Sequence, residues 1–567
     1  MVYWQSHTSY EFGPFRVDTR ERQLLRDGEI VPLRPKVFDI LLTLVENSGR
    51  ILTKEDVMRR VWSSTIVEEG NIARNISTLR SVLGERPKES QYIETIPWRG
   101  YRFVAKVKEI RDRVGEVDSL AVLPFVNVNA DDKSEYLCEG ITENLITSLA
   151  QLTDIRVTSR NSAFRYKERE VDVQTVGQQL KVAAVVLGRV AFAEDLVSIS
   201  VEVVDSRDDR HIWGAQFVRE PSDLSTLADA IARKIAETLG FELPADKQRL
   251  ISPRHTSNHE AYLCYLKGRY FFNKLTPDGV TKGIELFQQA IALDPAYALA
   301  YAGLGDCHNY LAQRDEAKTA VQKALALNKT LGEVHASLGW HRFLYDWDFA
   351  GAEQEFKQAL TLTPNYAEAH HWFAIFLANI GRHDEAEPHA HRAVELDPLS
   401  LMMNMTPALN LYLSRDYERA VEQLQRIIEM EPGFIAARSV KGNVLVQLGR
   451  YDEALAEFRK VVELLGDVEI AKVSVKALMA QAYARWEKRE DARKLLDEVL
   501  TAGTASPYSV AGIYSALGET DMAFNALEDA YNQRDVQLVS LKVDPSLDSL
   551  RPDPRFAQLV RQVGIPN

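Results

Sequence analysis

The chain has 567 residues, 46% of them hydrophobic and 26% charged, and a net charge of -13. This length exceeds one hydrophobic core and predicts three or four domains. The acidic total argues against nucleic-acid binding over the whole surface, and the three scattered cysteines (Cys138, Cys264, Cys307) form neither a CxxC pair nor a disulfide framework. The charge is uneven, because residues 1–113 hold 20 Lys and Arg against 16 Asp and Glu.

The sequence predicts a cytoplasmic protein without membrane contact. Its longest apolar run, 182–187, is far below the roughly 20 residues that a membrane helix needs. The opening residues lack the pattern of a secretory signal peptide. Unpaired cysteines also fit a reducing compartment.

Short strands and two helices are expected first. Apolar residues alternate over 9–33, and turns are expected at 13–14, 18–19 and 27–28. A helix should begin at Pro35 and end near 47–49. Its apolar positions are Val37, Phe38, Ile40, Leu41, Leu44 and Val45. Thr53 is expected to cap a second helix that contains Val57, Val61 and Trp62, with Glu55 and Asp56 near its positive end.

A third helix has a face suited to base edges. Its apolar residues recur every three or four positions and are Ile72, Ile76, Leu79 and Leu83. Gly84 is expected to end it. The other face carries Asn71, Arg74, Asn75 and Thr78, while the carboxylates of Glu68 and Glu69 lie only at the amino end. Arginine pairs with guanine, asparagine with adenine, and the threonine methyl with thymine.

A hairpin is expected over 92–103. Arg99 and Gly100 form its turn, and Tyr101 and Phe103 point inward as anchors. A tip that carries Arg99 and Arg102 suits a minor groove. A helix for one groove and a basic loop for the next together predict a DNA-reading module.

The stretches LRPKVFDILLTLVENSGRILTKEDVMRRVW, IARNISTLRSVLGE and YIETIPWRGYRF closely resemble the winged-helix effector domain of OmpR-type transcription regulators. The resemblance covers 9–106. It implies that the third helix enters the major groove and that the wing arginine, Arg99, reaches the minor groove. It further implies that Arg74, Asn75 and Thr78 read bases, with Asn71 on the same face, and that Ser77, Arg80 and Thr53 contact phosphates.

This chain departs from the family at Ser77 and Thr78, where members often have two arginines. Phosphate would then be held less tightly, which makes dimers or tandem sites more necessary. We expect no phosphoacceptor receiver domain. The alternative for any single polar residue of this face is a solvated helix surface without a DNA contact.

A charged linker is predicted at 107–117, followed by a small α/β domain with a mixed sheet at 118–241. The stretches SLAVLPF, GITENLITSLAQL, VLGRV and IWGAQF resemble the amino-terminal domain of TolB-like proteins. Strands are expected in AAVVLGRVAFA, LVSISVEVVD and HIWGAQFV, with turns at 194–195 and 206–209 between them. Ligand binding by this domain is left open.

No catalytic constellation is visible in the sequence. There is no GxxxxGK phosphate loop and no GxSxG elbow. The acidic pairs at 131–132 and 208–209 are interpreted as solvated turn residues, because adjacent loop acids rarely converge on one ion. Cys138 lies on an apolar stretch and is expected in the core. We therefore expect no enzyme, no cofactor and no metal.

A second linker is predicted at 242–258, and 259–567 is predicted to be a tetratricopeptide-repeat domain. Pro364, Pro398 and Pro432 are each 34 residues apart, with small residues between them at matching positions. About eight helix pairs are expected between 260 and 532. They should stack into a right-handed superhelix that a helix in the tail caps.

The first helix of each repeat should line a concave groove for a protein or peptide. The expected groove residues are Glu368, His371, Ile375, Met402, Met405, Leu409, Tyr412, Ser439 and Asn443. Methionines suit an adaptable apolar floor, and packing between repeats is the equal alternative for Met402 and Met405. His370, His371, His383, His389 and His391 are spread over both helices and the turn, which favours surface histidines over a metal site.

The expected architecture is multidomain: a winged helix-turn-helix, a small α/β domain, and an all-α repeat superhelix. This order resembles CadC-like and HilA-like regulators without a membrane span. We expect a one-component regulator that binds double-stranded DNA, whose repeats bind a protein or mediate self-association. The rival hypothesis is a non-enzymatic interaction scaffold in which the winged helix is a structural or docking module.

Overall fold

A computed structural model gives the architecture of the chain. The residues that it describes are 8–19, 22–26, 29–61, 70–85, 90–111, 117–129, 134–152, 155–167, 172–193, 196–220, 223–241, 256–274, 276–311, 313–466 and 468–566. They form two compact units, residues 1–116 together with 238–240, and the remainder. We describe each unit separately.

The first unit opens with the predicted antiparallel strands β1 (Thr8–Phe12), β2 (Phe15–Asp18), β3 (Gln23–Arg26) and β4 (Glu29–Val31). The predicted turn at 27–28 lies outside the described residues. A fifth strand, β8 (Lys108–Arg111), pairs with β1 at the far edge. The prediction of a linker at 107–117 is therefore wrong for residues 108–111. The sequence did not predict this strand because its charged side chains show no alternation of apolar and polar residues. The strand forms through backbone hydrogen bonds to β1.

Three helices and a second sheet complete this unit. They are α1 (Pro35–Glu46), α2 (Lys54–Val61), α3 (Gly70–Val82), β5 (Ile51–Leu52), β6 (Ile93–Ile96) and β7 (Gly100–Phe103). All six predicted apolar positions of α1 are buried. Phe12 lies at the centre of the core, with its ring centroid 4.9 Å from that of Phe103 and 5.5 Å from that of Tyr92. Trp62, Glu68 and Glu69 lie outside the described part.

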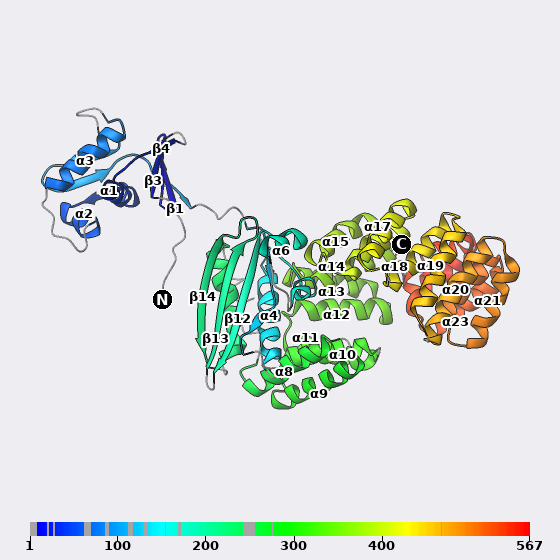
Figure 1. The fold of residues 1–567 in the computed structure, drawn as a ribbon. Helices are drawn as coiled ribbons and strands as arrows, with labels where there is room; N and C mark the ends of the chain where they lie inside the picture. The colour runs from blue at the N-terminus through cyan, green and yellow to red at the C-terminus, as the bar shows by residue number, and fades with distance from the viewer. Residues whose placement is uncertain are drawn as a thin grey trace. The chain divides into compact units, whose positions relative to one another are not determined.

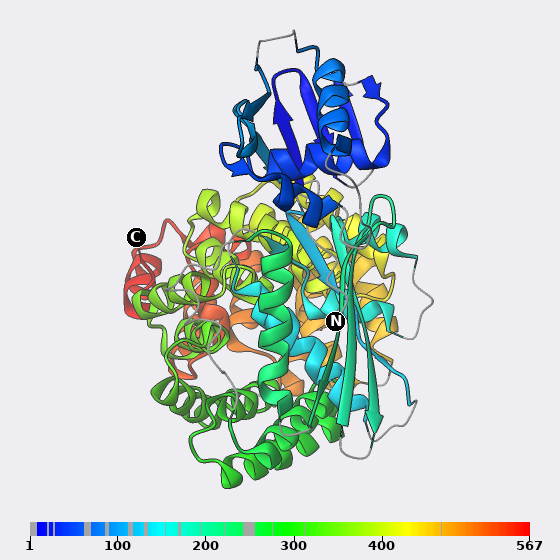
Figure 2. The same ribbon diagram turned by 90° about the vertical axis from the view of Figure 1, so that its left-hand side faces the viewer.

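The second unit begins with the predicted mixed sheet. Its strands are β9 (Ser119–Val122), β10 (Val126–Asn127), β11 (Arg156–Val157), β12 (Ala184–Ala193), β13 (Leu196–Asp205) and β14 (His211–Arg219). The order is β11-β9-β12-β13-β14, and β10 also pairs with β12. The β9 pairings are parallel and β12-β13-β14 is antiparallel. Figure 2 shows these three long strands side by side.

Helices accompany this sheet. They are α4 (Glu135–Ala150), α5 (Arg160–Ala163), η1 (Phe164–Tyr166), α6 (Val173–Leu180) and α7 (Leu224–Thr238). Cys138 is fully buried on α4, which confirms its prediction as a core residue. The short helices α5 and η1 were not predicted. The acidic pair at 131–132 and the turn at 194–195 lie outside the described residues.

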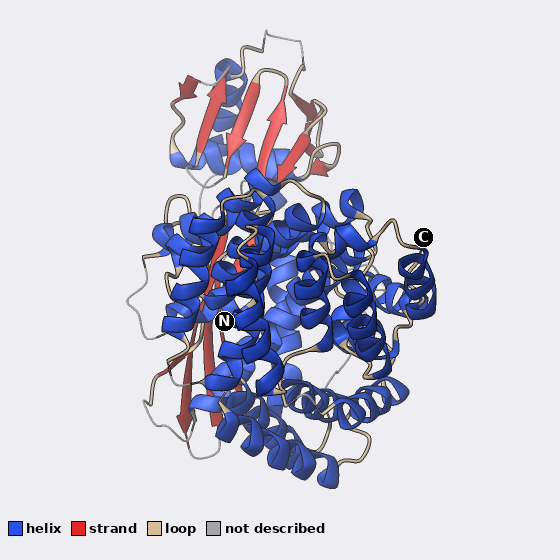
Figure 3. Cartoon of the chain, turned by 90° about the vertical axis from the view of Figure 1, so that its right-hand side faces the viewer, coloured by secondary structure: helices blue, strands red, loops and turns tan. Residues whose placement is uncertain are grey.

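Eight helix pairs follow in the described part of the chain, as the repeat period predicts. Figure 3 shows that this part of the chain is almost entirely helical. The first helices are α8 (His259–Phe272), α10 (Ala298–Tyr310), α12 (Gly332–His341), α14 (Ala367–Asn379), α16 (Leu401–Leu413), α18 (Ile435–Gln447), α20 (Glu469–Arg485) and α22 (Pro507–Leu517). The second helices are α9 (Pro277–Leu293), α11 (Arg314–Leu327), α13 (Phe349–Leu362), α15 (His383–Leu396), α17 (Tyr417–Met430), α19 (Tyr451–Leu464), α21 (Arg489–Ala502) and α23 (Thr520–Asn532). A π-helical turn, η4 (Arg342–Asp346), extends α12.

The small α/β domain is docked on the first four repeats. Helix α4 packs on α8 (Figure 1), where Asn144 Nδ2 donates a 3.0 Å hydrogen bond to the Tyr262 hydroxyl. A Cβ on Gly140 would lie 2.7 Å from the Leu266 Cδ2, so a larger residue there would force the Leu266 side chain to move. Further along, Asn365 Nδ2 donates to the carbonyls of Leu152 and Ile155 at 2.7 and 2.8 Å. These buried polar contacts fix the domain against the repeats.

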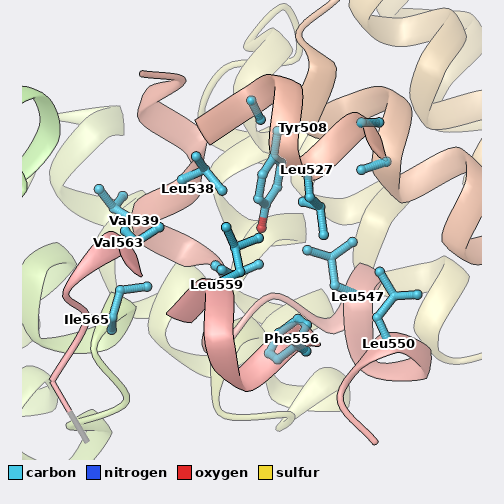
Figure 4. Close-up of a cluster of buried hydrophobic side chains, with 14 of the residues drawn as sticks. Tyr508, Leu527, Leu538, Val539, Leu547, Leu550, Phe556, Leu559, Val563 and Ile565 are labelled. Atoms are coloured by element: carbon cyan, nitrogen blue, oxygen red, sulfur yellow. The ribbon is translucent and has the colours of Figure 1, made fainter. Parts of the chain in front are cut away.

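The C-terminal segment, residues 533–566, contains η5 (Val536–Ser540), η6 (Pro545–Leu550) and α24 (Pro554–Val563). Figure 4 shows the α24 side chains Phe556, Leu559 and Val563 in one buried cluster with side chains from α22 and α23. The same cluster includes Phe343 and Phe376 from the third and fourth repeats.

This segment therefore does more than the predicted cap of the last repeat. Ser540 Oγ donates to Asn379 Oδ1 at 2.6 Å, and Arg415 Nη1 donates to the Val543 carbonyl at 2.6 Å. Both contacts reach repeats far back along the chain. The repeat period in the sequence predicts only that neighbouring repeats stack. It could not predict that the C-terminal segment packs against earlier repeats.

Membrane-spanning helices and metal-binding clusters are both absent from the described part of the chain. None of its helices is both long enough and apolar enough to cross a membrane. Within the same residues, no group of three or more His, Cys, Asp or Glu side chains could hold a metal ion.

Candidate DNA interface and repeat cavities

The start of α2 is fixed by a reciprocal cap. Asp56 N–H donates to Thr53 Oγ1 at 3.1 Å, and Thr53 N–H donates to Asp56 Oδ2 at 3.2 Å. This is the capping-box arrangement that satisfies two backbone donors at once. The hydrogen bonds from Thr53 lower the pKa of the Asp56 carboxyl. The role of Thr53 as the helix cap is confirmed. Its hydroxyl also donates a hydrogen bond to the Asp56 carboxylate.

Helix α3 separates its two faces as predicted. Ile72, Ile76, Leu79 and Leu83 are buried. Asn71, Arg74, Ser77 and Thr78 are exposed, and Asn75 is half-buried. Asn75 Nδ2 donates to the Asn71 carbonyl at 2.9 Å, and Thr78 Oγ1 donates to the Arg74 carbonyl at 3.0 Å. In the unbound chain these two side chains are therefore satisfied by their own helix.

Arg80, the expected phosphate contact, already has partners within the unbound chain. Its Nη2 donates to the Ile93 carbonyl at 2.8 Å and to Thr95 Oγ1 at 2.9 Å, and its Nε lies 3.2 Å from the buried Glu85 carboxylate. Glu85 also accepts a 2.8 Å hydrogen bond from Ile93 N–H. Arg80 thus ties α3 to strand β6 of the wing. Sequence spacing showed its place on the helix but not these partners.

The hairpin predicted as the wing is confirmed as β6 and β7, with Tyr101 and Phe103 buried. Arg102 lies opposite Glu94 across the hairpin, and its Nη2 is 2.6 Å from the Glu94 carboxylate. The positive charge of Arg102 is therefore paired, which weakens the expectation that it contacts DNA. Arg99 is exposed at the tip.

The tip has two features that sequence reasoning missed. Gly100 has a φ of +141°, and a Cβ there would lie 2.0 Å from the Leu52 carbonyl oxygen, so the wing can pack on the start of α2 only with glycine. Trp98 has a φ of +61° and a fully exposed side chain. An aromatic ring held in solvent beside Arg99 is unusual for a residue that normally prefers burial. The sequence PWRG at 97–100, with a proline and a glycine around Trp98 and Arg99, could have indicated this exposed turn.

The concave side of the repeats holds a cavity of about 290 Å³. Four expected groove residues line it: Ile375, Leu409, Tyr412 and Asn443. Later parts of the same chain also line this cavity. They contribute Tyr508 from α22 and Gln537, Ser540 and Asp544 from the C-terminal segment. An open peptide groove at these residues is therefore wrong for this chain, because its own C-terminal segment lies across them.

The other expected groove residues lie elsewhere. Met405 is packed in a core cluster with Leu424, so the inter-repeat alternative holds for it. His371 is buried and its Nδ1 lies 2.5 Å from Thr406 Oγ1, and burial lowers its pKa to about 4. Both are corrected to interior residues. Met402 is exposed, and Ser439 lies half-buried on α18.

Glu368 lines a second cavity of about 630 Å³, between the α/β domain and the first four repeats. Burial raises the pKa of its carboxyl to about 7, with Asp397 adding to the rise. In the same wall, Arg269 Nη2 lies 2.7 Å from Glu143 and its Nη1 2.9 Å from Asp306. Burial raises the pKa of Asp306 to about 6 despite this arginine. The pair network joins α4 to α8 and α10.

Comparison with protein families agrees with this geometry. Residues 28–103 match the family described as transcriptional regulatory protein, C terminal, and 116–234 match the second domain of HilA/YgeH-like transcriptional regulators. Residues 355–387 match the tetratricopeptide repeat, and 379–461 match subunit 3 of the anaphase-promoting complex. These matches define the class: the chain is a transcriptional regulator with an OmpR-type DNA-binding domain, a HilA-like second domain and tetratricopeptide repeats.

Among particular proteins, the chain is similar to the transcriptional regulator HilA of Salmonella typhi. The two are 23% identical over 432 residues, which cover 73% of this chain and 75% of HilA. The transcriptional activator CadC of Escherichia coli is 30% identical over 113 residues, 20% of this chain and 22% of CadC. A putative adenylate cyclase 3 of Rhizobium meliloti is 29% identical over 186 residues, 33% of this chain and 32% of that protein.

Proposed function

We propose that the first unit binds double-stranded DNA sequence-specifically, with α3 in the major groove and the wing in the adjacent minor groove. Arg74, Asn71, Asn75 and Thr78 would read base edges, and Ser77 would contact phosphate. Arg99 would enter the minor groove. Asn75 and Thr78 must first break their hydrogen bonds to carbonyl groups of α3, whereas Arg74 is already exposed to solvent. This makes Arg74 the strongest candidate for base reading.

The single observation that carries the proposal is the exposed polar face of α3 beside the exposed Arg99. The α3 sequence contains no carboxylate between Gly70 and Val82. A carboxylate-free face can approach the DNA backbone without charge repulsion, and exposed side chains can enter a groove without unfolding. The pairing of Arg80 with Glu85 and of Arg102 with Glu94 leaves fewer cations for phosphate, so we expect a shallow salt dependence for one subunit.

Selection of bound sequences from a random DNA pool tests the proposal directly. The full chain should enrich a motif, and a repeated half-site would support self-association of the chain on DNA. Arg74→Ala should cost about 1–3 kcal/mol on the enriched site and relax the preference at one base pair.

The control for this selection is Gln358→Leu. Gln358 is exposed on α13 in the second unit. Its substitution removes a carboxamide from the repeats and leaves the α3 face intact, so the enriched motif should not change. If Arg74→Ala keeps the full sequence preference, Arg74 does not read bases. If neither the full chain nor residues 1–113 enrich any motif at low salt, the rival scaffold hypothesis replaces DNA binding.

Arg99→Ala should weaken binding to all sequences alike. An arginine in the minor groove lies between the phosphates of the two strands, so its loss should reduce the slope of log K against log salt by about 1, whereas the loss of a base contact in the major groove leaves the slope nearly unchanged. Measuring the slope for Arg74→Ala and Arg99→Ala at several salt concentrations therefore separates the two roles. An unchanged slope and affinity in Arg99→Ala would remove the wing arginine from the interface.

Trp98→Ala should weaken binding without changing the salt slope. Apolar and stacking contacts release no counterions, and aromatic contacts with nucleic acid are worth about 1–3 kcal/mol each. Affinity should therefore fall at least about fivefold, while Trp98→Phe should retain most of it. Fluorescence anisotropy with the enriched DNA measures both quantities. Equal affinities of Trp98→Ala and the parent chain would show that the exposed ring lies away from the DNA.

The second unit is proposed to control this module through a protein partner or through self-association, without enzymatic activity. Tetratricopeptide repeats and the OmpR-type domain together support protein and DNA partners. Because bacterial DNA lies in the cytoplasm, the proposal places the chain there. Removal of residues 260–567 should raise DNA affinity if the repeats mask the first unit, and should lower it if they hold two subunits together.

A further inference from the structure

The 290 Å³ cavity on the concave side of the repeats has an unusual wall. Equivalent positions of four successive repeats, each 34 residues apart, face it. They carry Asn379, Leu413, Gln447 and Gln481. Stacked repeats place equivalent positions in a row, so three carboxamides and one leucine form a ladder along the cavity.

Two carboxamides in this wall offer unused hydrogen-bonding groups. Asn379 is engaged with Ser540 and with the Ile375 carbonyl, and Gln481 Nε2 donates to the Ser509 carbonyl at 3.4 Å. For Gln447 and Asn443, the structure shows no side-chain hydrogen bond to any described residue. Both side chains line the cavity, and each amide carries two N–H donors and one acceptor oxygen.

The charged groups of the wall are already engaged. Arg485 Nη2 donates to the carbonyls of Pro545 and Ser546, both at 3.2 Å. The Asp544 carboxylate accepts from the Tyr508 hydroxyl at 2.9 Å and from Ser546 N–H at 2.8 Å. Arg485 and Asp544 carry opposite charges in the same wall, so a ligand of either sign would meet one attractive and one repulsive charge while it lost its hydration, which is costly. The wall therefore favours a neutral ligand.

An apolar strip completes the lining, with Ile375, Leu409, Val440 and Leu478. Amide groups that both donate and accept match neighbouring hydroxyls, which also do both. The apolar strip matches the C–H face of a sugar ring. The volume lies at the lower end of small-molecule pockets, which are about 300–1,000 Å³.

We propose that this cavity binds a neutral polyhydroxylated small molecule, a mono- or disaccharide, held by Asn443 and Gln447. The ligand would also touch Gln537 and Ser540, so it would join the C-terminal segment to the fourth, fifth and sixth repeats. This inference does not rest on DNA binding, and Arg74→Ala should bind the same ligand unchanged.

Isothermal titration calorimetry on the full chain tests it, with glucose, galactose and maltose as neutral probes and glucosamine and glucuronate as charged ones. At least one neutral sugar should bind saturably at millimolar concentration or below. Its charged analogue should bind at least tenfold more weakly. Saturable binding of glucosamine or glucuronate alone, or of no probe, would overturn the proposal.

Two variants locate the site. Gln447→Leu should bind the sugar at least tenfold more weakly, and it should fold normally because Leu413 occupies the equivalent position of the preceding repeat. Asn443→Leu should behave alike, since Leu409 is its equivalent. Gln358→Leu on the exposed face of α13 is the matched control and should bind like the parent chain. Full sugar binding by both cavity variants, with an unchanged melting temperature, would place the sugar elsewhere and overturn this assignment.

Discussion

Gly100→Ala should abolish DNA binding by disrupting the wing. The new Cβ would lie 2.0 Å from the Leu52 carbonyl oxygen and 2.9 Å from the Thr53 Cα, and both are backbone atoms that cannot rotate away. The hairpin would have to separate from the start of α2, with a cost of at least about 3 kcal/mol, typical of severe core overpacking. Hydrogen exchange over 93–103 should accelerate, while exchange over 259–566 should not change.

Gly49→Ala provides the matched control. Gly49 also has a positive φ, +80°, but a Cβ there meets no atom within 4 Å. The substitution should cost only the backbone term of about 1 kcal/mol, and DNA binding should persist. Comparable loss of protection in both variants would show that backbone strain, and not the close approach to Leu52, makes Gly100 necessary.

Arg269→Leu should strongly destabilise the second unit. The guanidinium pairs with Glu143 at 2.7 Å and with Asp306 at 2.9 Å. Its removal leaves Asp306 without its cation and leaves the buried Glu143 carboxylate with Arg160 alone, at 3.1 Å. Breaking a buried pair costs about 3–5 kcal/mol. For a unit of this size the melting temperature should fall by about 3–5 °C. Scanning calorimetry of the full chain measures this change.

The loss should depend on pH. Burial already raises the pKa of Asp306 to about 6, and removal of the arginine would raise it further. A carboxyl whose pKa is higher in the folded state destabilises the fold above that pKa, and the penalty fades as the pH falls and the folded state takes up a proton. The difference between Arg269→Leu and the parent chain should therefore be larger at pH 8 than at pH 5.5.

Lys318→Leu is the control for a lost ion pair. Lys318 Nζ lies 2.7 Å from Asp346, and both side chains are about one-third exposed, whereas Arg269 and Glu143 are 20% and 16% exposed. Solvent screens such a pair, so the substitution should cost at most about 1 kcal/mol. Equal destabilisation by the two substitutions would show that burial does not strengthen the Arg269 network.

The fold was largely predictable because its elements are periodic. The buried faces of α1 and α3 follow from apolar spacing, and the eight helix pairs follow from the 34-residue period. Strand β8 was not predicted because it forms through backbone hydrogen bonds, while its side chains, such as Lys108, are largely charged and show no apolar alternation. Helix α5 was missed because four residues are too few to show a period.

The candidate sites were less predictable, because they depend on long-range contacts. Spacing placed Arg80 and Arg102 on the correct elements, but not their partners. Glu94 meets Arg102 only when β6 pairs with β7, and Ile93 meets Arg80 only when the hairpin packs on α3. The groove residues Ile375 and Asn443 were expected on the concave side. Their neighbours in the C-terminal segment are distant in sequence, so a period of 34 residues could not indicate a cavity that this segment helps to line.

The return of the C-terminal segment has a consequence for synthesis of the chain. Phe343 and Phe376 share a core with Phe556 and Val563, so the repeat domain cannot complete this core until Val563 has left the ribosome. Protein synthesis proceeds at about 5–20 residues per second, so on the order of 10–40 seconds pass between the synthesis of Phe376 and that of Val563. The first unit has its own core and its chain emerges first. A nascent chain therefore holds a DNA-reading module well before the rest of the protein is finished, and a chain that loses its last thirty residues never closes the cavity.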